Sequence, residues 1–138
     1  MRLEKASEKA IVFACKNFHY SKSKPQSLMA FSVFNDSNEW CGVIVYSLGA
    51  NKYLGSPYGL KNGSAIELVR VALNGKQEQT TKAVSLSLKL IKKFAPLVRM
   101  VISYADKDQN HTGIIYQASN WYYTGLLNDG AVSFKILS

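Results

Sequence analysis

Three side chains able to exchange a proton or a hydrogen bond follow an apolar run in the second half of the sequence. Residues 97–104 read LVRMVISY, which predicts a strand covered on both sides. Tyr104, Asp106 and His111 lie at or just beyond its end, and ligand sites of open sheets form beyond the carboxyl ends of strands. A carboxylate there could accept the proton of an amine or hold its N–H group. The alternative is ordinary turn chemistry, because Asp and Asn favour loops.

A second candidate site lies at the expected start of a long helix. Residues 74–82 read NGKQEQTTK, and Thr80 or Thr81 is the expected helix cap. The unpaired N–H groups and partial positive charge of a helix N-terminus suit a phosphate. The residues that would hold such a phosphate are Gly75, Lys76, Thr80, Thr81 and Lys82. The alternative is an ordinary capped and solvated helix start.

The basic segment HYSKSKP, residues 19–25, is a third candidate region. Its histidine could act as a base or as a metal ligand near neutral pH, although a histidine at a helix end more often interacts only with the helix dipole. His19 and His111 are the only histidines of the chain. An iron site of the 2-His-1-carboxylate type would therefore need both, together with an acid such as Asp106 or Glu67.

Two charged residues lie inside an apolar strand. Glu67 and Arg70 belong to the segment AIELVRVAL, Ala65–Leu73, and strict alternation along a strand predicts that they face opposite sides. Either charge needs a partner in such surroundings. Arg70 could bind a phosphate, and Glu67 could orient another group of the site. The alternative is a structural ion pair with a neighbouring strand.

The elements that must position these residues predict a single α/β (α+β) domain over residues 1–138. We expect one mixed, twisted sheet of about six to seven strands with helices on both faces. The expected strands are residues 2–6, 27–35, 39–48, 65–73, 97–104, 121–127 and 132–137. The expected helices are a helix capped by Ser7 and ending at Phe18, then residues 80–94 and 112–119.

The connections between these elements carry their own signals. Asn128-Asp129-Gly130 is typical of a tight hairpin, and residues 105–110 are expected to form a loop. Strands 65–73 and 97–104 should be parallel neighbours joined through the long helix by a right-handed crossover. They should diverge at their carboxyl ends and leave a cleft there.

The charge balance favours an anionic partner. The chain has 17 Lys and Arg against 9 Asp and Glu, a formal charge of +8, which suits nucleic acid, a phosphate-bearing cofactor or a membrane surface. No apolar run approaches the roughly 18 residues that span a bilayer. Cys15 and Cys41 form no CxxC pair, which suits a reducing cytoplasm. DNA binding would rest on Lys22, Lys24, Lys52, Lys61 and Lys107, with Tyr53 and Tyr58; the alternative is a scattered lysine surface.

One long segment resembles a known signature. Residues 102–125, ISYADKDQNHTGIIYQASNWYYTG, resemble the C-terminal signature of the Mom family of phage DNA-modification proteins. HYSKSKP at residues 19–25 and ELVRV at residues 67–71 match the other blocks of that family in the same order. The resemblance therefore spans most of the chain, and the expected element order is that of the GNAT acyltransferases, to which the family is similar.

The resemblance implies an enzyme that transfers an acyl-derived group, of the carbamoylmethyl type, to adenine N6 of double-stranded DNA. It implies a phage protein in the cytoplasm of a bacterial host, acting against restriction, with acetyl-CoA or another activated acyl donor. It also implies iron, and it allows a homodimer. Its catalytic residues would be Asp106, Tyr116, His19, Tyr20 and Ser103. A tyrosine at the position of Tyr116 protonates the leaving thiolate in GNAT enzymes, and a phenol of pKa about 10 is a suitable acid.

The resemblance also implies a DNA-binding set, namely Ser21, Lys22, Lys24, Tyr104, Asn120, Trp121 and Tyr123. An asparagine can hydrogen-bond the edge of adenine, and aromatic rings can stack on a flipped base. Trp121 and Tyr123 alternate along a strand with Tyr122, so one face must be core, and core packing is the alternative role of Trp121.

One departure concerns the donor. GNAT enzymes usually carry an R/Q-x-x-G-x-G/A loop for the pyrophosphate, and NGKQEQTTK stands in its place. Two other functions therefore stay open: a GNAT N-acetyltransferase acting on a small-molecule or protein amine, and a non-catalytic basic DNA-binding module. Convergence of Asp106, Tyr116 and His19 on one pocket would distinguish an enzyme from the binding module.

Overall fold

The computed structural model describes residues 1–19, 22, 27, 29–47, 64–106, 122–127 and 130–136, and from residue 104 onward only their backbone. In chain order the elements are β1 (Arg2–Lys5), α1 (Glu8–Phe18), β2 (Met29–Phe34), β3 (Trp40–Ser47), β4 (Ala65–Leu73), α2 (Thr80–Phe94), β5 (Met100–Asp106), β6 (Tyr122–Leu127) and β7 (Gly130–Ile136). The expected helix at residues 112–119 lies outside the described residues.

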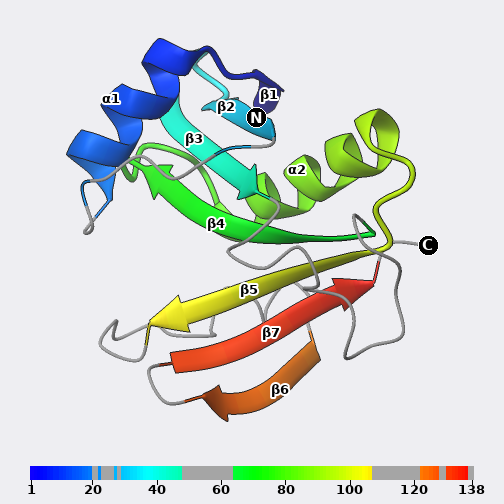
Figure 1. Cartoon of the computed structure of the whole chain (residues 1–138). Helices are drawn as coiled ribbons and strands as arrows, with labels where there is room; N and C mark the ends of the chain where they lie inside the picture. The colour runs from blue at the N-terminus through cyan, green and yellow to red at the C-terminus, as the bar shows by residue number, and fades with distance from the viewer. Residues whose placement is uncertain are drawn as a thin grey trace.

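The described strands form one mixed sheet in the order β1-β2-β3-β4-β5-β7-β6, seven strands in all (Figure 1). β4 and β5 are parallel, and each other neighbouring pair is antiparallel. The predicted parallel pair, separated in sequence by α2, is therefore confirmed. The strands on either side of the predicted hairpin pair antiparallel as expected, with Leu127 opposite Gly130, while Asn128 and Asp129 lie outside the described residues.

Helix α1 forms where its local sequence predicts it. Ser7 is the N-cap, and its side chain accepts a hydrogen bond from the backbone N–H of Ala10 at 3.1 Å. Ile11, Ala14 and Cys15 recur at helical spacing and are buried. The cap and the apolar stripe together fix both the start of α1 and the face that it turns to the sheet.

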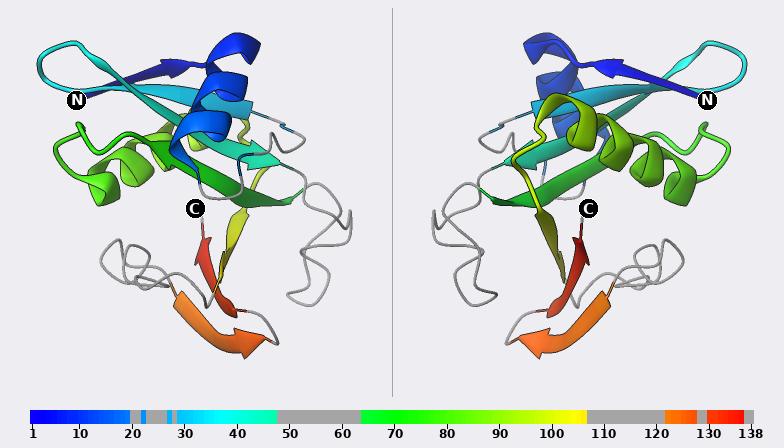
Figure 2. Two further views of the ribbon diagram at one scale, coloured as in Figure 1. Left: turned by 90° about the vertical axis from the view of Figure 1, so that its left-hand side faces the viewer. Right: turned by 90° about the vertical axis from the view of Figure 1, so that its right-hand side faces the viewer.

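The core is divided between two clusters that use alternate residues of β3. Val43 and Val45 pack with α1, whereas Ile44 and Tyr46 pack with α2. Alternate residues of a strand point to opposite faces, so the two helices use different faces of β3. Figure 2 shows that both helices lie near β1–β4, whereas β6 and β7 lie at the far end of the sheet.

The start of β5 differs from the expectation. The strand begins at Met100 and not at Leu97, because the backbone N–H groups of Arg99 and Met100 donate to the carbonyl of Ser64 and bring the chain beside β4 only there. Leu97 is 82% exposed. Its apolar side chain therefore wrongly suggests, from the sequence, that the buried strand begins at this residue. No helix in the described part of the chain is long and apolar enough to cross a membrane.

Candidate functional site

The candidate site lies where β4 and β5 separate. The two strands pair only through Ala65–Met100, Ile66–Val101 and Glu67–Ile102. β4 continues to Leu73 and β5 to Asp106, and Figure 1 shows the two arrows diverging toward their carboxyl ends. The predicted divergence is confirmed. It leaves strand edges beside which an extended ligand could lie.

A β-bulge in β4 changes which side chains share a face. Arg70 opposes Val45 and Glu67 opposes Ser47, so β4 has one extra residue, Val69, within this stretch. Val45 and Ser47 are two apart on β3 and share the face covered by α1. Glu67 and Arg70 therefore lie on the same face. The expectation that they face opposite sides is wrong, because it assumed uninterrupted alternation.

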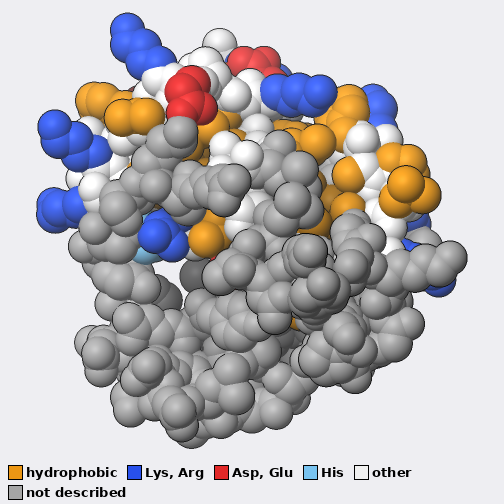
Figure 3. Space-filling model, viewed as in Figure 1, with side chains coloured by type: hydrophobic (Ala, Val, Ile, Leu, Met, Phe, Trp, Pro, Cys, Tyr) orange, Lys and Arg blue, Asp and Glu red, His pale blue; other side chains and the backbone are white. Residues whose placement is uncertain are grey.

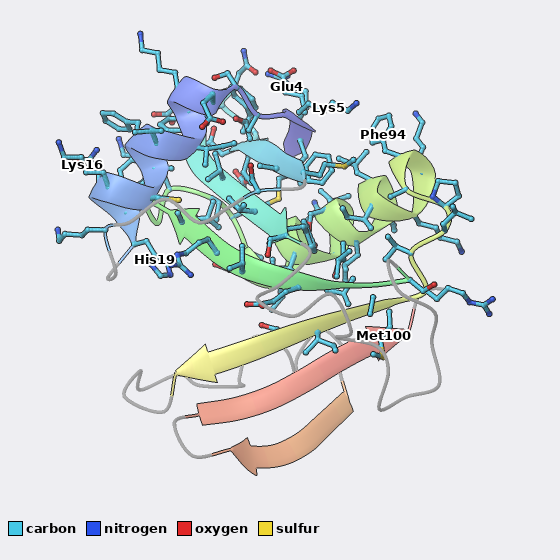
Figure 4. All side chains as sticks on the ribbon, viewed as in Figure 1. Glu4, Lys5, Lys16, His19, Phe94 and Met100 are labelled. Carbon is cyan, nitrogen blue, oxygen red and sulfur yellow. The ribbon has the colours of Figure 1, made fainter. Side chains whose placement is uncertain are left out.

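His19 brings an imidazole to this face. It follows α1 directly and lies beside the carboxyl end of β4 (Figure 4). Burial, together with the positive charge of Arg70, lowers the pKa of His19 to about 4. Burial raises the pKa of Glu67, and the charge of Arg70 opposes that rise. His19, Arg70 and Glu67 therefore form one electrostatic cluster, in which the imidazole is neutral at neutral pH.

Two buried polar atoms near the divergence have no hydrogen-bond partner. Arg70 donates through Nη1 to the carbonyl oxygen of Val69 at 2.8 Å, but its Nε makes no bond. Ser103 is 1% exposed, its Oγ makes no bond, and it is the first residue of β5 beyond the paired stretch. An unpaired buried polar group costs about 1–3 kcal/mol. Both atoms therefore suit a ligand that supplies the missing partners.

The start of α2 is open to an anion. Its N-cap is Gln79, which makes no side-chain capping bond, and its first turn contains no acidic residue. The expectation that Thr80 or Thr81 caps the helix is wrong: the Thr80 hydroxyl instead accepts a hydrogen bond from Gln77 Nε2 at 3.0 Å. The first N–H groups of α2 thus lack a side-chain acceptor of the kind that Ser7 gives to α1.

The loop before α2 is held by its own side chains. Gly75 donates its backbone N–H to Gln77 Oε1 at 3.1 Å, and Lys76 donates its own to Asn74 Oδ1 at 2.9 Å. The side chains of Lys76 and Lys82 are exposed. Lys82 lies close enough to Asp36 to help lower the pKa of that carboxyl, and Glu78 accepts a hydrogen bond from the backbone N–H of Asp36, so the lysines would hold a phosphate beside these two acids.

The backbone places further predicted residues near the end of β5. Asp106 is the last residue of β5 and pairs with Gly130, so Ala105 and Asp106 lie in a strand and not in the expected loop. Ser103 opposes Ser133 of β7, which opposes Tyr123 of β6. Tyr104 pairs with Val132. The remaining predicted residues lie outside the described part of the chain: Tyr20, Ser21, Lys24, Tyr116, Asn120, Trp121, and also Lys52, Tyr53, Tyr58, Lys61, Lys107 and His111.

The described residues do not fit an iron site. Among them, no group of three His, Cys, Asp or Glu side chains could hold a metal ion. Arg70 also puts a positive charge close enough to His19 to lower its pKa, and that charge would repel a metal cation.

The low pKa of His19 predicts a pH-dependent stability. Between about pH 6.5 and pH 4 the unfolded chain binds a proton at His19 and the folded chain does not, so the free energy of unfolding should fall as the pH is lowered through this range. Urea unfolding of the wild type and of His19→Gln at several pH values measures the effect. The variant should lose this part of the pH dependence, and parallel curves for the two proteins would contradict the assignment.

The fold is similar to those of several solved structures. GCN5 from Tetrahymena superposes with a TM-score of 0.65 at 10% identity, covering 100% of this chain and 97% of that one. A GNAT family N-acetyltransferase from Escherichia coli, solved in complex with CoA, gives 0.63 at 8% identity, covering 99% and 81%. For a GNAT family acetyltransferase from Listeria monocytogenes the values are 0.57 and 10%, and the match covers 78% of this chain and 64% of that one. The fold is therefore GNAT-like.

Comparison of the sequence with known proteins identifies the family. No curated protein matches this chain. The sequence profile of the Mom protein family, in contrast, matches residues 1–137. Since that match spans nearly the whole sequence, the chain belongs to the Mom protein family.

Proposed function

We propose that this protein transfers an acyl-derived group of the carbamoylmethyl type from an activated donor to adenine N6 in double-stranded DNA, in the cytoplasm of a bacterial host. The match to the Mom family over residues 1–137 carries the proposal. The GNAT-like fold supports it, since solved neighbours include acetyltransferases and one of them was solved in complex with CoA.

The described residues fit an acyl-CoA donor. The uncapped start of α2, with Lys76 and Lys82, suits its phosphates. The separated edges of β4 and β5 suit an extended arm that carries amide groups, which could pair with strand edges. Arg70 Nε and Ser103 Oγ are buried donors without partners beside that path. When bound, such a donor supplies an acyl group activated as a thioester.

Adenine N6 is a weak nucleophile, because its lone pair is delocalised into the ring. An oriented amine and a nearby proton acceptor would contribute about 10²–10⁴-fold. We place a flipped adenine between residues 19–21, 104–106 and 120–123. Flipping costs a few kcal/mol, and stacking on an aromatic ring offsets about 1–3 kcal/mol.

The roles follow from charge. A histidine of pKa about 4 is a weak base, so His19 would orient the acceptor by a hydrogen bond. Asp106, at the carboxyl end of β5, is the proposed partner of the amine proton. Tyr116 is the proposed acid for the leaving thiolate.

Asp106→Asn keeps the shape of the side chain and removes the base, so adenine modification should be lost while DNA binding survives. Mass spectrometry of nucleosides from cells that express the protein measures modification, and a gel shift measures DNA affinity. Asp36→Asn makes the same chemical change at an exposed aspartate and should retain activity. Full modification by Asp106→Asn would remove Asp106 from the mechanism. Unmodified DNA despite abundant wild-type protein would favour the binding module.

A further inference from the structure

Helix α1 exposes two lysines on the side away from the sheet. Ile11, Ala14 and Cys15 are buried, so the opposite side of the helix faces solvent. Lys9 and Lys16 are exposed there, seven residues apart, which is about 10.5 Å along the helix. Figure 3 shows hydrophobic side chains at the surface over α1, with Lys or Arg side chains beside them.

Two apolar side chains flank these lysines. Val12 is 45% exposed and Phe13 is 52% exposed. We call Lys9, Val12, Phe13 and Lys16 the α1 surface. Its charge is mainly basic, because Glu8 is the one acid of the helix and already makes an interaction within the chain. A basic surface with an exposed aromatic ring is typical of nucleic-acid binding.

The aromatic ring of the α1 surface is held in place. Phe13 contacts Phe18 and Trp40, each with a centroid distance of 5.8 Å. Trp40 is fixed in turn, since its Nε1 donates to Ser32 Oγ at 3.2 Å. Depressions of about 500 and 540 Å³ lie beside Phe13; Lys9 lines both, Glu4 lines the first and Glu8 the second. The ring of Phe13 is therefore held between two surface depressions by its contacts with Phe18 and Trp40.

The α1 surface leads directly to the candidate site. His19 follows the helix, and the exposed Lys22 donates its backbone N–H to the carbonyl of His19 at 3.2 Å. Lys9 lies ten residues before His19, about 15 Å along the helix, or roughly four base pairs of a duplex. DNA that presents a base beside His19 would therefore have its neighbouring phosphates within reach of α1.

Helix α2 is also rich in lysine, but it lies elsewhere. It packs with Ile44 and Tyr46, whereas α1 packs with Val43 and Val45 on the other face of β3. Glu67 and Arg70 lie on the α1 face. Lys89 and Lys92 of α2 are exposed. They provide a control pair of lysines on the face of the sheet opposite to the α1 surface.

We infer that the α1 surface binds the DNA backbone beside the modified adenine, with Lys9 and Lys16 contacting phosphates and Phe13 packing against the sugars. This inference rests on the proposed function, which makes double-stranded DNA the substrate. It extends the proposed DNA contacts from Lys22 onto helix α1.

The salt dependence of DNA binding tests the inference. Fluorescence anisotropy with a labelled duplex would give affinity against salt concentration for the wild type, for Lys9→Gln/Lys16→Gln and for Lys89→Gln/Lys92→Gln. Loss of two phosphate contacts should reduce the slope of log K against log salt by about 1.8. The α2 double variant has the same net charge and should keep the wild-type slope. Phe13→Ala should lower affinity without changing the slope.

The outcomes separate this inference from the proposed function. Equal slopes for the two double variants would overturn the inference, even if adenine is still modified. The α1 surface would then be assigned to another partner, such as an acidic protein. A reduced slope only for the α1 variant supports the inference, even if no modified adenine is found and the enzyme proposal fails. Failure of the wild type to bind DNA would overturn both.

Discussion

Replacing Arg70 with methionine should raise the pKa of His19 and sharply reduce the proposed adenine modification. The positive charge of Arg70 helps to hold the pKa of His19 at about 4, and the same charge opposes the rise in the pKa of Glu67. Methionine keeps much of the side-chain length but removes both the charge and the partnerless Nε. Loss of a hydrogen-bond donor that contacts the charge developing in the transition state costs about 10²–10³-fold in kcat.

The control for this prediction is Arg70→Lys, which keeps the charge and loses the planar fork. NMR titration of the two histidines, with His19→Gln for assignment, measures the pKa. The lysine variant should keep a low pKa for His19 and still lose modification, because Nε is gone. A methionine variant with an unchanged pKa for His19 would contradict the electrostatic cluster, and full activity of both variants would exclude Arg70 from the site.

Gly42→Ala should be among the most damaging substitutions for stability. Gly42 has a φ of 131° and pairs with Leu73, and an added Cβ would lie 2.0 Å from the carbonyl oxygen of Ala72. That oxygen belongs to the backbone of β4, so β3 and β4 must move apart. We expect a loss of about 4 kcal/mol in the free energy of unfolding, measured by urea denaturation.

Gly75→Ala is the matched control. Gly75 also has a positive φ, 89°, but an added Cβ would meet nothing within 4 Å. Only backbone strain remains, so the loss should be about 1–2 kcal/mol. Similar losses at the two glycines would show that the close approach to Ala72 is not the cause. Circular dichroism before denaturation establishes that both variants are folded.

Much of the fold could be predicted because its signals are local. Ser7 and the spacing of Ile11, Ala14 and Cys15 define α1 without reference to the rest of the chain. The bulge at Val69 could not be predicted in this way, because it exists only in the pairing of β4 with β3. One extra residue in a strand reverses the face of each side chain beyond it, and this is why strict alternation predicts opposite faces for Glu67 and Arg70 whereas the structure puts both on one face.

The site was harder to predict than the fold. His19 and Arg70 are 51 positions apart in sequence, and no spacing rule indicates that the charge of one lowers the pKa of the other. Ser103 was implied by family resemblance, but its partnerless hydroxyl is visible only in three dimensions. The convergence of Asp106, Tyr116 and His19 stays a prediction, because Tyr116 lies outside the described residues.

The short ladder between β4 and β5 also has a mechanical consequence. With three residue pairs it is the shortest ladder among the described strands, and it joins the helix-bearing β1–β4 to a ribbon of β5, β7 and β6. Such a seam allows the ribbon to open as a separate cooperative unit in amide hydrogen exchange. An acyl donor that lies along the free edges of both β4 and β5 would act as an inserted strand. It would connect β1–β4 to the ribbon of β5, β7 and β6. Exchange should then slow even in β6, which the donor does not touch.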